Sequence, residues 1–305
     1  MDAHGNSGSS VSVTNVDILV PCANVLGESP LWCVRRQRLF WVDIRAPALH
    51  ACDADGGNVT TWPMPEVIGS FALQSTDNMI VALKSGFHTF DPATGALAAI
   101  VEPACGQPQH RFNEGKCDPR GRFWAGTMND VVRDPTGVLY RLDPDFSCRP
   151  MRTGFAVPNS LAWSPDGTRM YFADTEAKTI WRYTYDLDTG TFADERVFVD
   201  CSNSDARPDG ATVDAAGCLW SAEVVTGRVV RYAPDGRALA AVQLPVSRVT
   251  SLTFGGTDLR TLYITSSSFK LTPEQRAAQP HAGAVFAMRC DVAGLPAALF
   301  GATRA

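Results

Sequence analysis

The chain has 305 residues and a formal net charge of −5; 45% of its residues are hydrophobic and its mean hydropathy is −0.07. A chain of this size can bury a large core, roughly three quarters of its unfolded surface. The acidic balance and the absence of a lysine/arginine run argue against nucleic acid or an anionic membrane as a partner. No apolar run approaches the ~18 residues of a membrane span. The expected partner is a small molecule. The oligomeric state stays open, and a monomer is compatible with the sequence.

The start of the chain and its cysteines together indicate the compartment of the protein. The first fifteen residues lack the basic start and apolar core of a signal peptide, so residues 1–15 are expected to form a flexible tail. Nine cysteines, odd in number and never spaced Cys-x-x-Cys, argue against a disulfide framework and a thiolate zinc site. We expect inert reduced thiols and a cytoplasmic location.

One pattern recurs along the chain: a reference residue, a short apolar strand, a turn, and a second strand of aromatic and small residues. It is clearest in NEGKCDPRGRFWAG, NSLAWSPDGTRMYFAD and DGATVDAAGCLWSAE, and weaker copies occur in three further segments. The reference residues, 41 to 50 positions apart, are Glu28, Gly69, Asn113, Asn159, Asp209 and Thr250. A second alternating pattern ending in turn residues follows each unit.

Six such units are typical of a β-propeller. We therefore predict an all-β fold, a six-bladed β-propeller with four-stranded antiparallel blades, in a single domain spanning residues 16–305. The segment VDILVPC near the start is expected to supply an outer strand of the last blade. The stretch LTPEQRAAQ (271–279), which alone has a short helical period, is interpreted as an inserted loop.

The tripeptide Pro-Asp-Gly occurs three times, at 165–167, 208–210 and 234–236. All three of its residues favour turns. The first and third copies fall between or after strands and are predicted to be turns. The second places Asp209 at a reference position, just before an innermost strand.

Innermost strands line the channel of a propeller, so the reference residues should converge near its mouth. Five of the six are polar, and burying them costs several kcal/mol each, about 2–7, unless they are paired. Glu28, Asn159 and Asp209 offer oxygen ligands and two negative charges, a set that suits Ca²⁺, Mg²⁺ or Mn²⁺ and is compatible with Zn²⁺ or Fe²⁺. Taken alone, Asn159 or Asp209 also fits a turn cap, but their shared phase favours a site.

Four stretches resemble the senescence marker protein/gluconolactonase/luciferin-regenerating family, which includes regucalcin and bacterial sugar lactonases. They are LGESPLW (26–32), RFNEGKCDPRGRFWAGTM (111–128), VPNSLAWSPDGTRMYFADT (157–175) and RPDGATVDAAGCLW (207–220). The resemblance covers about residues 16–300 and implies a six-bladed propeller with one divalent metal ion on Glu28, Asn159 and Asp209. It also implies that Arg111 and Asn113 contact the substrate.

The chain departs from the family pattern at two motif positions and in one stretch. The family often has Gly where this chain has Ser160, and Asp where it has Glu114. An acidic residue that some animal members place on the sugar has no clear counterpart in NDVVRDP (129–135). LGESP, the segment 271–287 and the ending DVAGLPAALF look like bacterial aldonolactonases, which suggests a pentonolactone such as L-arabinonolactone.

These residues predict the metal-dependent hydrolysis of a sugar lactone, with the metal polarising the carbonyl or its attacking water and Asp209 as general base. The alternative is a non-enzymatic, calcium-binding regulatory protein of regucalcin type. A protein-interaction platform and a relative of the strictosidine-synthase propellers fit less well. His110 is either at the edge of the site or in a solvent-facing loop. Asp174 and Glu176 are expected to solvate or brace a blade, and the recurring tryptophans are expected to pack between blades.

Overall fold

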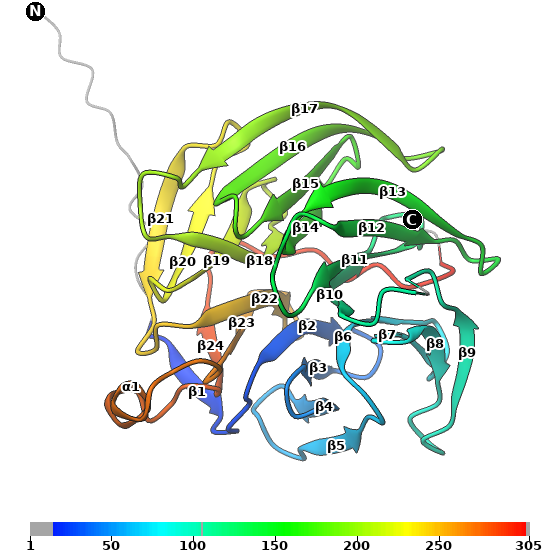
Figure 1. The fold of residues 1–305 in the computed structure, drawn as a ribbon. Coiled ribbons are helices and arrows are strands. Elements are labelled where there is room, and N and C mark those ends of the chain that lie inside the picture. The colour runs from blue at the N-terminus through cyan, green and yellow to red at the C-terminus, as the bar shows by residue number, and fades with distance from the viewer. Residues whose placement is uncertain (1–14, 105, 303–305) are drawn as a thin grey trace, which may run out of the picture.

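The computed structural model describes residues 15–104 and 106–302 and is a ring of six four-stranded antiparallel sheets (Figure 1). The innermost strands of the six sheets surround the centre of the ring. This arrangement confirms the predicted all-β, six-bladed propeller. The expected flexible tail lies outside the described residues, apart from residue 15.

The blades are numbered from the first innermost strand. Blade 1 consists of β2 (Gly27–Cys33), β3 (Arg38–Asp43), β4 (Ala48–Asp53) and β5 (Thr60–Pro63). Blade 2 consists of β6 (Ile68–Leu73), β7 (Met79–Leu83), β8 (Gly86–Phe90) and β9 (Leu97–Val101). Blade 3 consists of β10 (His110–Cys117), β11 (Phe123–Asn129), β12 (Gly137–Leu142) and β13 (Cys148–Phe155).

The second half of the ring repeats this order. Blade 4 consists of β14 (Pro158–Trp163), β15 (Arg169–Asp174), β16 (Thr179–Asp186) and β17 (Thr191–Asp200). Blade 5 consists of β18 (Arg207–Val213), β19 (Leu219–Val224), β20 (Arg228–Tyr232) and β21 (Ala238–Gln243). Blade 6 consists of β22 (Val249–Gly255), β23 (Thr261–Ser266), β24 (Val285–Arg289) and β1 (Asp17–Val20).

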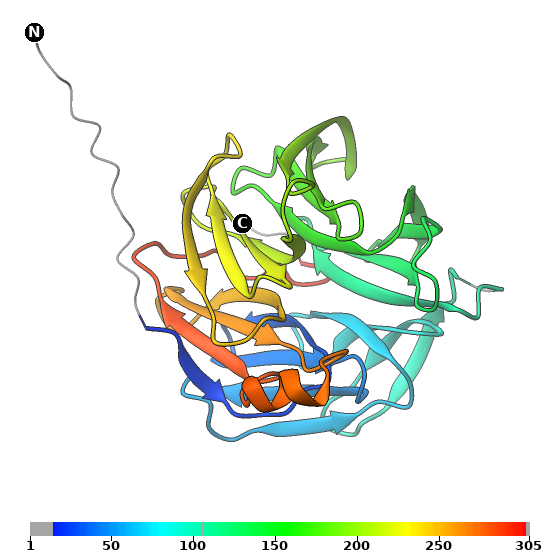
Figure 2. The same cartoon turned by 60° about the vertical axis from the view of Figure 1, so that its left-hand side comes forward.

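Blade 6 closes the ring with strands from both ends of the chain. Strand β1 pairs antiparallel with β24, with Asp17 opposite Ala287 and Ile18 opposite Phe286. Figure 2 shows β1 in dark blue beside this last blade. The prediction that VDILVPC supplies an outer strand of the last blade is confirmed.

The loop between β23 and β24 carries the only helix within residues 15–104 and 106–302, α1 (Pro273–Ala278). It begins with a capping box, in which Thr272 and Gln275 each accept a hydrogen bond from the other's backbone N–H. No helix in the described part of the chain has the length and apolarity to cross a membrane. The expected insertion at 271–279 is present, and six of its nine residues are helical.

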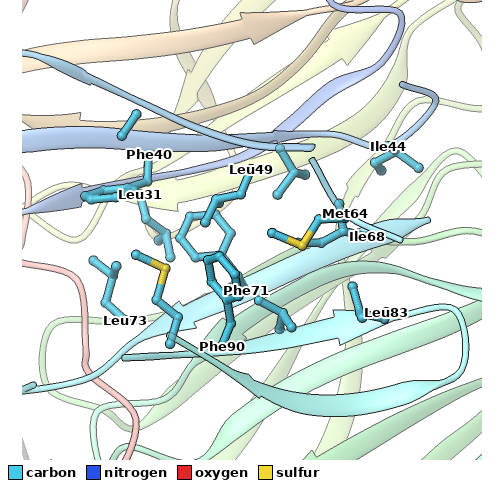
Figure 3. Close-up of a cluster of buried hydrophobic side chains, with 14 of the residues drawn as sticks. Leu31, Phe40, Ile44, Leu49, Met64, Ile68, Phe71, Leu73, Leu83 and Phe90 are labelled. Atoms are coloured by element: carbon cyan, nitrogen blue, oxygen red, sulfur yellow. The ribbon is translucent and has the colours of Figure 1, made fainter. Parts of the chain in front are cut away.

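The core lies between neighbouring blades, where each sheet packs its apolar face against the next. Figure 3 shows the contact between blades 1 and 2, in which Phe40 and Leu49 meet Phe71 and Phe90. The expected packing role of the tryptophans is confirmed, since all are fully or largely buried in clusters between blades, apart from the partly buried Trp62 and Trp181. All eight described cysteines are free thiols, and Cys105 lies outside the described residues.

The C-terminal segment after β24 closes one end of the channel. It forms isolated bridges from Gly294 to Asp214 in blade 5 and from Phe300 to Gln74 in blade 2. Between these points, residues 295–298 line a cavity together with Lys116 on β10. In Figure 1 the segment is the red trace that crosses the middle of the ring. The reference residues lie nearer the opposite end of the channel.

Candidate functional site

Every innermost strand has a register shift at or beside its reference residue. In β2, Glu28 pairs with Val42 and Leu31 with Phe40, so one extra residue is inserted on the inner strand. The corresponding shifts in the other strands fall at 68/70, 112/115, 159/162, 208/211 and 249/251. A bulge of this kind bends a strand and re-aims its side chains. The reference residues therefore lie within the innermost strands and not before them, because pairing resumes on both sides of each bulge.

Two bulges place a serine in the left-handed conformation. Ser29 has φ 48° and Ser160 has φ 53°, a conformation that costs a non-glycine residue about 1–2 kcal/mol. Each side chain donates a hydrogen bond to the next blade: Ser160 Oγ to the Asp209 carbonyl at 2.6 Å, and Ser29 Oγ to the Gly69 carbonyl at 3.2 Å. These contacts offset the strain, which explains how the chain accepts serine at 160, where the resembled family often has glycine.

The five predicted site residues line one cavity of about 280 Å³. They come from four innermost strands, each is at most 8% exposed, and they are Glu28, Arg111, Asn113, Asn159 and Asp209.

The reference residues of blades 2 and 6 contribute differently. Thr250 also lines the cavity, and its Oγ1 donates to the Gly27 carbonyl at 2.5 Å. At Gly69 a Cβ atom would lie 2.3 Å from the Phe112 carbonyl oxygen, so close contact with β10 excludes a side chain there. Blade 2 therefore adds no functional group to the cavity from this position.

Glu28 and Asp209 line the same cavity, and the carboxyl group of each shifts the pKa of the other. Burial, together with the charge of Glu114, raises the pKa of Glu28 to about 8. Burial and the neighbouring Glu28 carboxylate hold the pKa of Asp209 well above its usual range. Without a cation, burial and the repulsion between the two carboxylates therefore favour the state in which the pair retains a proton.

A chain of hydrogen bonds fixes the two amides. Asn113 Nδ2 donates to the Pro158 carbonyl at 2.9 Å and to Asn159 Oδ1 at 3.1 Å. Asn159 Nδ2 donates to Thr175 Oγ1 at 2.7 Å, and that hydroxyl donates to the Pro208 carbonyl. Asn159 thus bonds across blades, and the turn-cap interpretation is wrong for it. Its Oδ1 keeps one lone pair for another partner.

Arg111 is buried but firmly held. Its Nε donates to Asp130 Oδ1 at 2.8 Å, and its Nη1 donates at 2.8 Å to both the Phe112 carbonyl and Asn113 Oδ1. Burial lowers the pKa of Arg111, while Asp130 opposes that shift. Within the described residues Arg111 Nη2 has no hydrogen-bond partner, so it is the part of the guanidinium free to meet a ligand in the cavity.

A buried ion pair lies next to the two carboxylates. Glu114 Oε2 accepts a hydrogen bond from the Leu161 N–H at 3.0 Å, and Glu114 Oε1 is 3.7 Å from Lys116 Nζ. Lys116 Nζ also donates to the Ala211 carbonyl at 2.6 Å. Because Glu114 has these partners, its longer side chain is accommodated where the resembled family often has aspartate.

The rim of the cavity contains charged residues that the repeat pattern did not predict. Glu176 accepts from Arg133 Nη1 at 2.8 Å and from Arg207 Nη1 at 2.6 Å, so it bridges two blades at the mouth. Arg248 and Lys270 complete the charged rim. Asp130 and Arg133 belong to the stretch NDVVRDP, which departs from the family pattern and offered no sequence signal for either contact.

The structure also tests the expectations for His110, Asp174 and Glu176. Both interpretations of His110 are wrong: it is 6% exposed, Nε2 lies 3.1 Å from Thr136 Oγ1, and it does not line the cavity. Asp174 braces blade 4 as expected, because its carboxylate accepts hydrogen bonds from the Ala156 and Val157 N–H groups. Glu176, expected to do the same, lines the cavity instead and braces its rim.

The donor set of the cavity fits a divalent cation. No cluster of three or more His, Cys, Asp or Glu side chains suited to a metal occurs within residues 15–104 and 106–302, and the set here comprises two carboxylates and an amide. A cation between Glu28 and Asp209 would replace the proton that the pair otherwise needs, and Asn159 Oδ1 would add a neutral ligand. These are hard oxygen donors in a water-accessible cavity, as Ca²⁺, Mg²⁺ and Mn²⁺ require.

Comparisons with known proteins agree in fold and in sequence. The chain is 44% identical over 280 residues to 6-deoxy-6-sulfogluconolactonase of Pseudomonas putida, covering 91% of this chain and 95% of that protein. It is 37% identical over 290 residues to L-arabinolactonase of Azospirillum brasilense, covering 94% and 95%. The crystal structure of regucalcin from Agrobacterium tumefaciens, titled a calcium-binding protein, superposes with a TM-score of 0.92 at 28% identity, covering 96% and 100%.

The family comparison covers the blades that build the cavity. Residues 26–268 match the family described as SMP-30/Gluconolactonase/LRE-like region, which confirms the resemblance carried by the four sequence motifs. That range begins just before β2 and ends after β23, so it includes the innermost strands of all six blades. The chain is therefore a member of the SMP-30/gluconolactonase/LRE-like family.

Proposed function

We propose that this protein hydrolyses a sugar lactone to the aldonic acid, with one divalent metal ion bound by Glu28, Asn159 and Asp209. The observation that carries the proposal is the convergence of these three oxygen donors in one cavity with Arg111 and Asn113. Similarity to two proteins named as lactonases supports the reaction class. The substrate we propose is an aldonolactone, a pentonolactone such as L-arabinonolactone or a hexonolactone such as gluconolactone.

A bound dication would polarise the lactone carbonyl and lower the pKa of a bound water. We propose that Asp209 takes the proton from the attacking water as its oxygen bonds to the carbonyl carbon. The ring C–O bond then breaks, and the released ring oxygen takes the proton held by Asp209 to become a hydroxyl.

Arg111 and Asn113 are proposed to position the lactone. Arg111 Nη2 can donate to a lactone or sugar oxygen, because its other donors are held by protein partners. Both Asn113 Nδ2 protons are committed to Pro158 and Asn159, so Asn113 can only accept a hydrogen bond from a sugar hydroxyl at Oδ1. Fixed donors and acceptors of this kind hold an ester in attack geometry.

The test is proton release during hydrolysis of pentono- and hexonolactones by metal-stripped and metal-restored protein. We expect metal-dependent turnover above the spontaneous rate, and a loss of about 10²–10⁴-fold in kcat for Asp209→Asn. The matched control is Asp235→Asn, in an exposed Pro-Asp-Gly turn, which should keep full activity. Full activity in Asp209→Asn would refute the assignment of the base.

A non-enzymatic calcium-binding role is the second candidate, favoured by the high structural similarity to the calcium-binding regucalcin. It requires the cation site but no turnover. Calorimetry of Ca²⁺ binding to the wild type and to Glu28→Gln, beside the lactone assay, separates the two functions: binding without hydrolysis of any lactone would favour this candidate. Under either function the free thiols fit the reducing cytoplasm, where we place the protein.

A further inference from the structure

The mouth of the cavity is cationic although the whole chain is acidic. Five cationic side chains line the cavity against three anionic ones, in a protein whose formal net charge is −5. The cations are Arg111, Arg133, Arg207, Arg248 and Lys270, and the anions are Glu28, Glu176 and Asp209.

Neither the inner carboxylates nor the rim carboxylate cancels this excess. Glu28 and Asp209 are the proposed ligands of a divalent cation, and Arg111 shares the carboxylate of Asp130 with Arg45. Arg133 and Arg207 both bind the single carboxylate of Glu176, at 2.8 and 2.6 Å. That group of three therefore keeps one positive charge.

Arg248 and Lys270 have no carboxylate partner within residues 15–104 and 106–302. Arg248 Nη2 donates only to the Lys270 carbonyl, at the long distance of 3.5 Å, and its Nε has no hydrogen-bond partner. Lys270 Nζ lies 5.5 Å from the centre of the Phe269 ring and makes no ion pair. Together with the surplus of the Glu176 group, Arg248 and Lys270 give the rim three positive charges without a carboxylate partner.

Gathering like charges at this rim, where Arg248 is half-buried and Lys270 is exposed, costs free energy. Burial and the nearby charge of Arg133 both lower the pKa of Arg248, so these cations sense one another. No protein contact among the described residues repays this cost. An anion at the rim would repay it, and guanidinium groups bind the oxygens of sulfonate, phosphate and carboxylate groups in a forked geometry.

We propose that the rim formed by Arg248 and Lys270, with Arg133 and Arg207 beside them, binds a sulfonate or phosphate group on the lactone. This inference rests on the proposed function and names its substrate class: an aldonolactone with an oxyanion substituent at the carbon farthest from the carbonyl. The carbonyl end would lie at Glu28, Asn159 and Asp209, and the substituent at the open mouth. Neutral lactones would lack this second anchor.

The experiment compares kcat/KM for three lactones: gluconolactone, gluconolactone with a sulfonate at carbon 6, and gluconolactone with a phosphate at carbon 6. We expect the wild type to prefer at least one anionic lactone by about 10-fold or more. In the double variant Arg248→Gln/Lys270→Gln the anionic-to-neutral ratio should fall by about 10–100-fold. The lactone with the higher kcat/KM shows whether the rim binds a sulfonate or a phosphate substituent.

The matched control is Arg237→Gln, which removes one positive charge from an exposed turn outside the cavity. It should leave the ratio unchanged, which would exclude a general effect of net charge. Equal or greater efficiency on neutral gluconolactone, or an unchanged ratio in the double variant, would overturn the proposal.

A binding measurement separates this inference from the proposed function. Calorimetry would compare gluconate with 6-phosphogluconate and 6-deoxy-6-sulfogluconate on the wild type and the double variant. If no lactone is hydrolysed but a doubly anionic acid binds more tightly through Arg248 and Lys270, the rim proposal stands and the lactonase proposal fails. If none of the acids binds more tightly than gluconate, the rim proposal fails, whatever the activity.

Discussion

Two buried carboxylates facing each other make the stability of this site depend on pH. The pKa of Glu28 is raised to about 8 by burial and by Glu114, whereas an exposed glutamate titrates near 4.5. Between these values the unfolded chain has released a proton that the folded, metal-free protein retains. The folded state therefore binds more protons, and its free energy of unfolding falls as pH rises through this window.

We predict that metal-stripped protein loses a few kcal/mol of stability, about 1.4 per pH unit at most from this group, between about pH 4.5 and pH 8. Urea denaturation at several pH values with and without a dication measures the effect. The dication should stabilise most at the upper end, because it replaces the missing proton. Glu28→Gln removes one of the two titrating carboxyl groups and should make the metal-free profile less steep. A wild-type profile that already matches this variant would contradict the prediction.

The sequence predicted some residues of the site and could not predict others. Glu28, Asn159 and Asp209 were found because each holds the same phase in its repeat unit. Arg133 and Arg248 lie outside the reference positions of that repeat, and their place on the rim depends on how separate blades meet in space. The register of a repeat does not indicate which side chains from separate blades meet at the rim.

At the scale of elements, the bulges of the innermost strands set the geometry of the site. In β18 the shift between Pro208 and Ala211 leaves Asp209 and Gly210 outside the regular ladder. A Cβ atom at Gly210 would lie 2.1 Å from Ser251 Oγ and 2.8 Å from its Cα. Close contact between β18 and β22 therefore demands glycine directly after the proposed base, which a turn-based interpretation of Pro-Asp-Gly does not explain.

We predict that Gly210→Ala destabilises the protein by about 1–3 kcal/mol, because β18 and β22 must move apart. The same shift displaces Asp209, so turnover should fall more than the loss of folded protein explains. Denaturation curves and kcat on the folded fraction measure the two effects. Gly57→Ala, at an exposed glycine whose near neighbour is the flexible Asp55 side chain, is the control. Wild-type stability in Gly210→Ala would show that the bulge can adjust.

At the turns between the first and second strands of two blades lies a recurring pair of residues, a buried aspartate and the tryptophan that donates a hydrogen bond to it. Asp118 and Asp214 are fully buried, and each accepts a hydrogen bond from the indole N–H of a tryptophan six positions later, Trp124 and Trp220. The spacing Asp-x₅-Trp recurs in phase in the sequence. The repeat pattern alone does not reveal this role, because tertiary contacts with a tryptophan and an arginine cannot be deduced from turn preferences.

At the scale of the whole molecule, the ring depends on its closure. The number of blades, the antiparallel order and the closing strand all follow from a repeat of 41 to 50 residues, so the sequence predicted them. The C-terminal segment that bridges blades 5 and 2 was not predicted, because DVAGLPAALF has no strand alternation. It is held by backbone hydrogen bonds to other blades.

Deleting residues 1–21 should expose the edge of β24 and the side chains beneath β1. We predict a lower denaturation midpoint and increased aggregation, because an unpaired strand edge invites pairing with other molecules. Light scattering during thermal unfolding measures both. Deleting only residues 1–14 keeps β1 and is the control, with little change expected. Equal behaviour of the two truncations would mean that blade 6 is complete with three strands.

The pairing of β1 with β24 also determines when blade 6 can form during synthesis of the chain. Ile18 lies opposite Phe286, 268 residues later in the chain. At about 5–20 residues per second, a ribosome needs about 15–50 seconds to deliver the partner strand after the first has emerged. During synthesis the first strand must wait for its partner, so the ring can be completed only after β24 has been made.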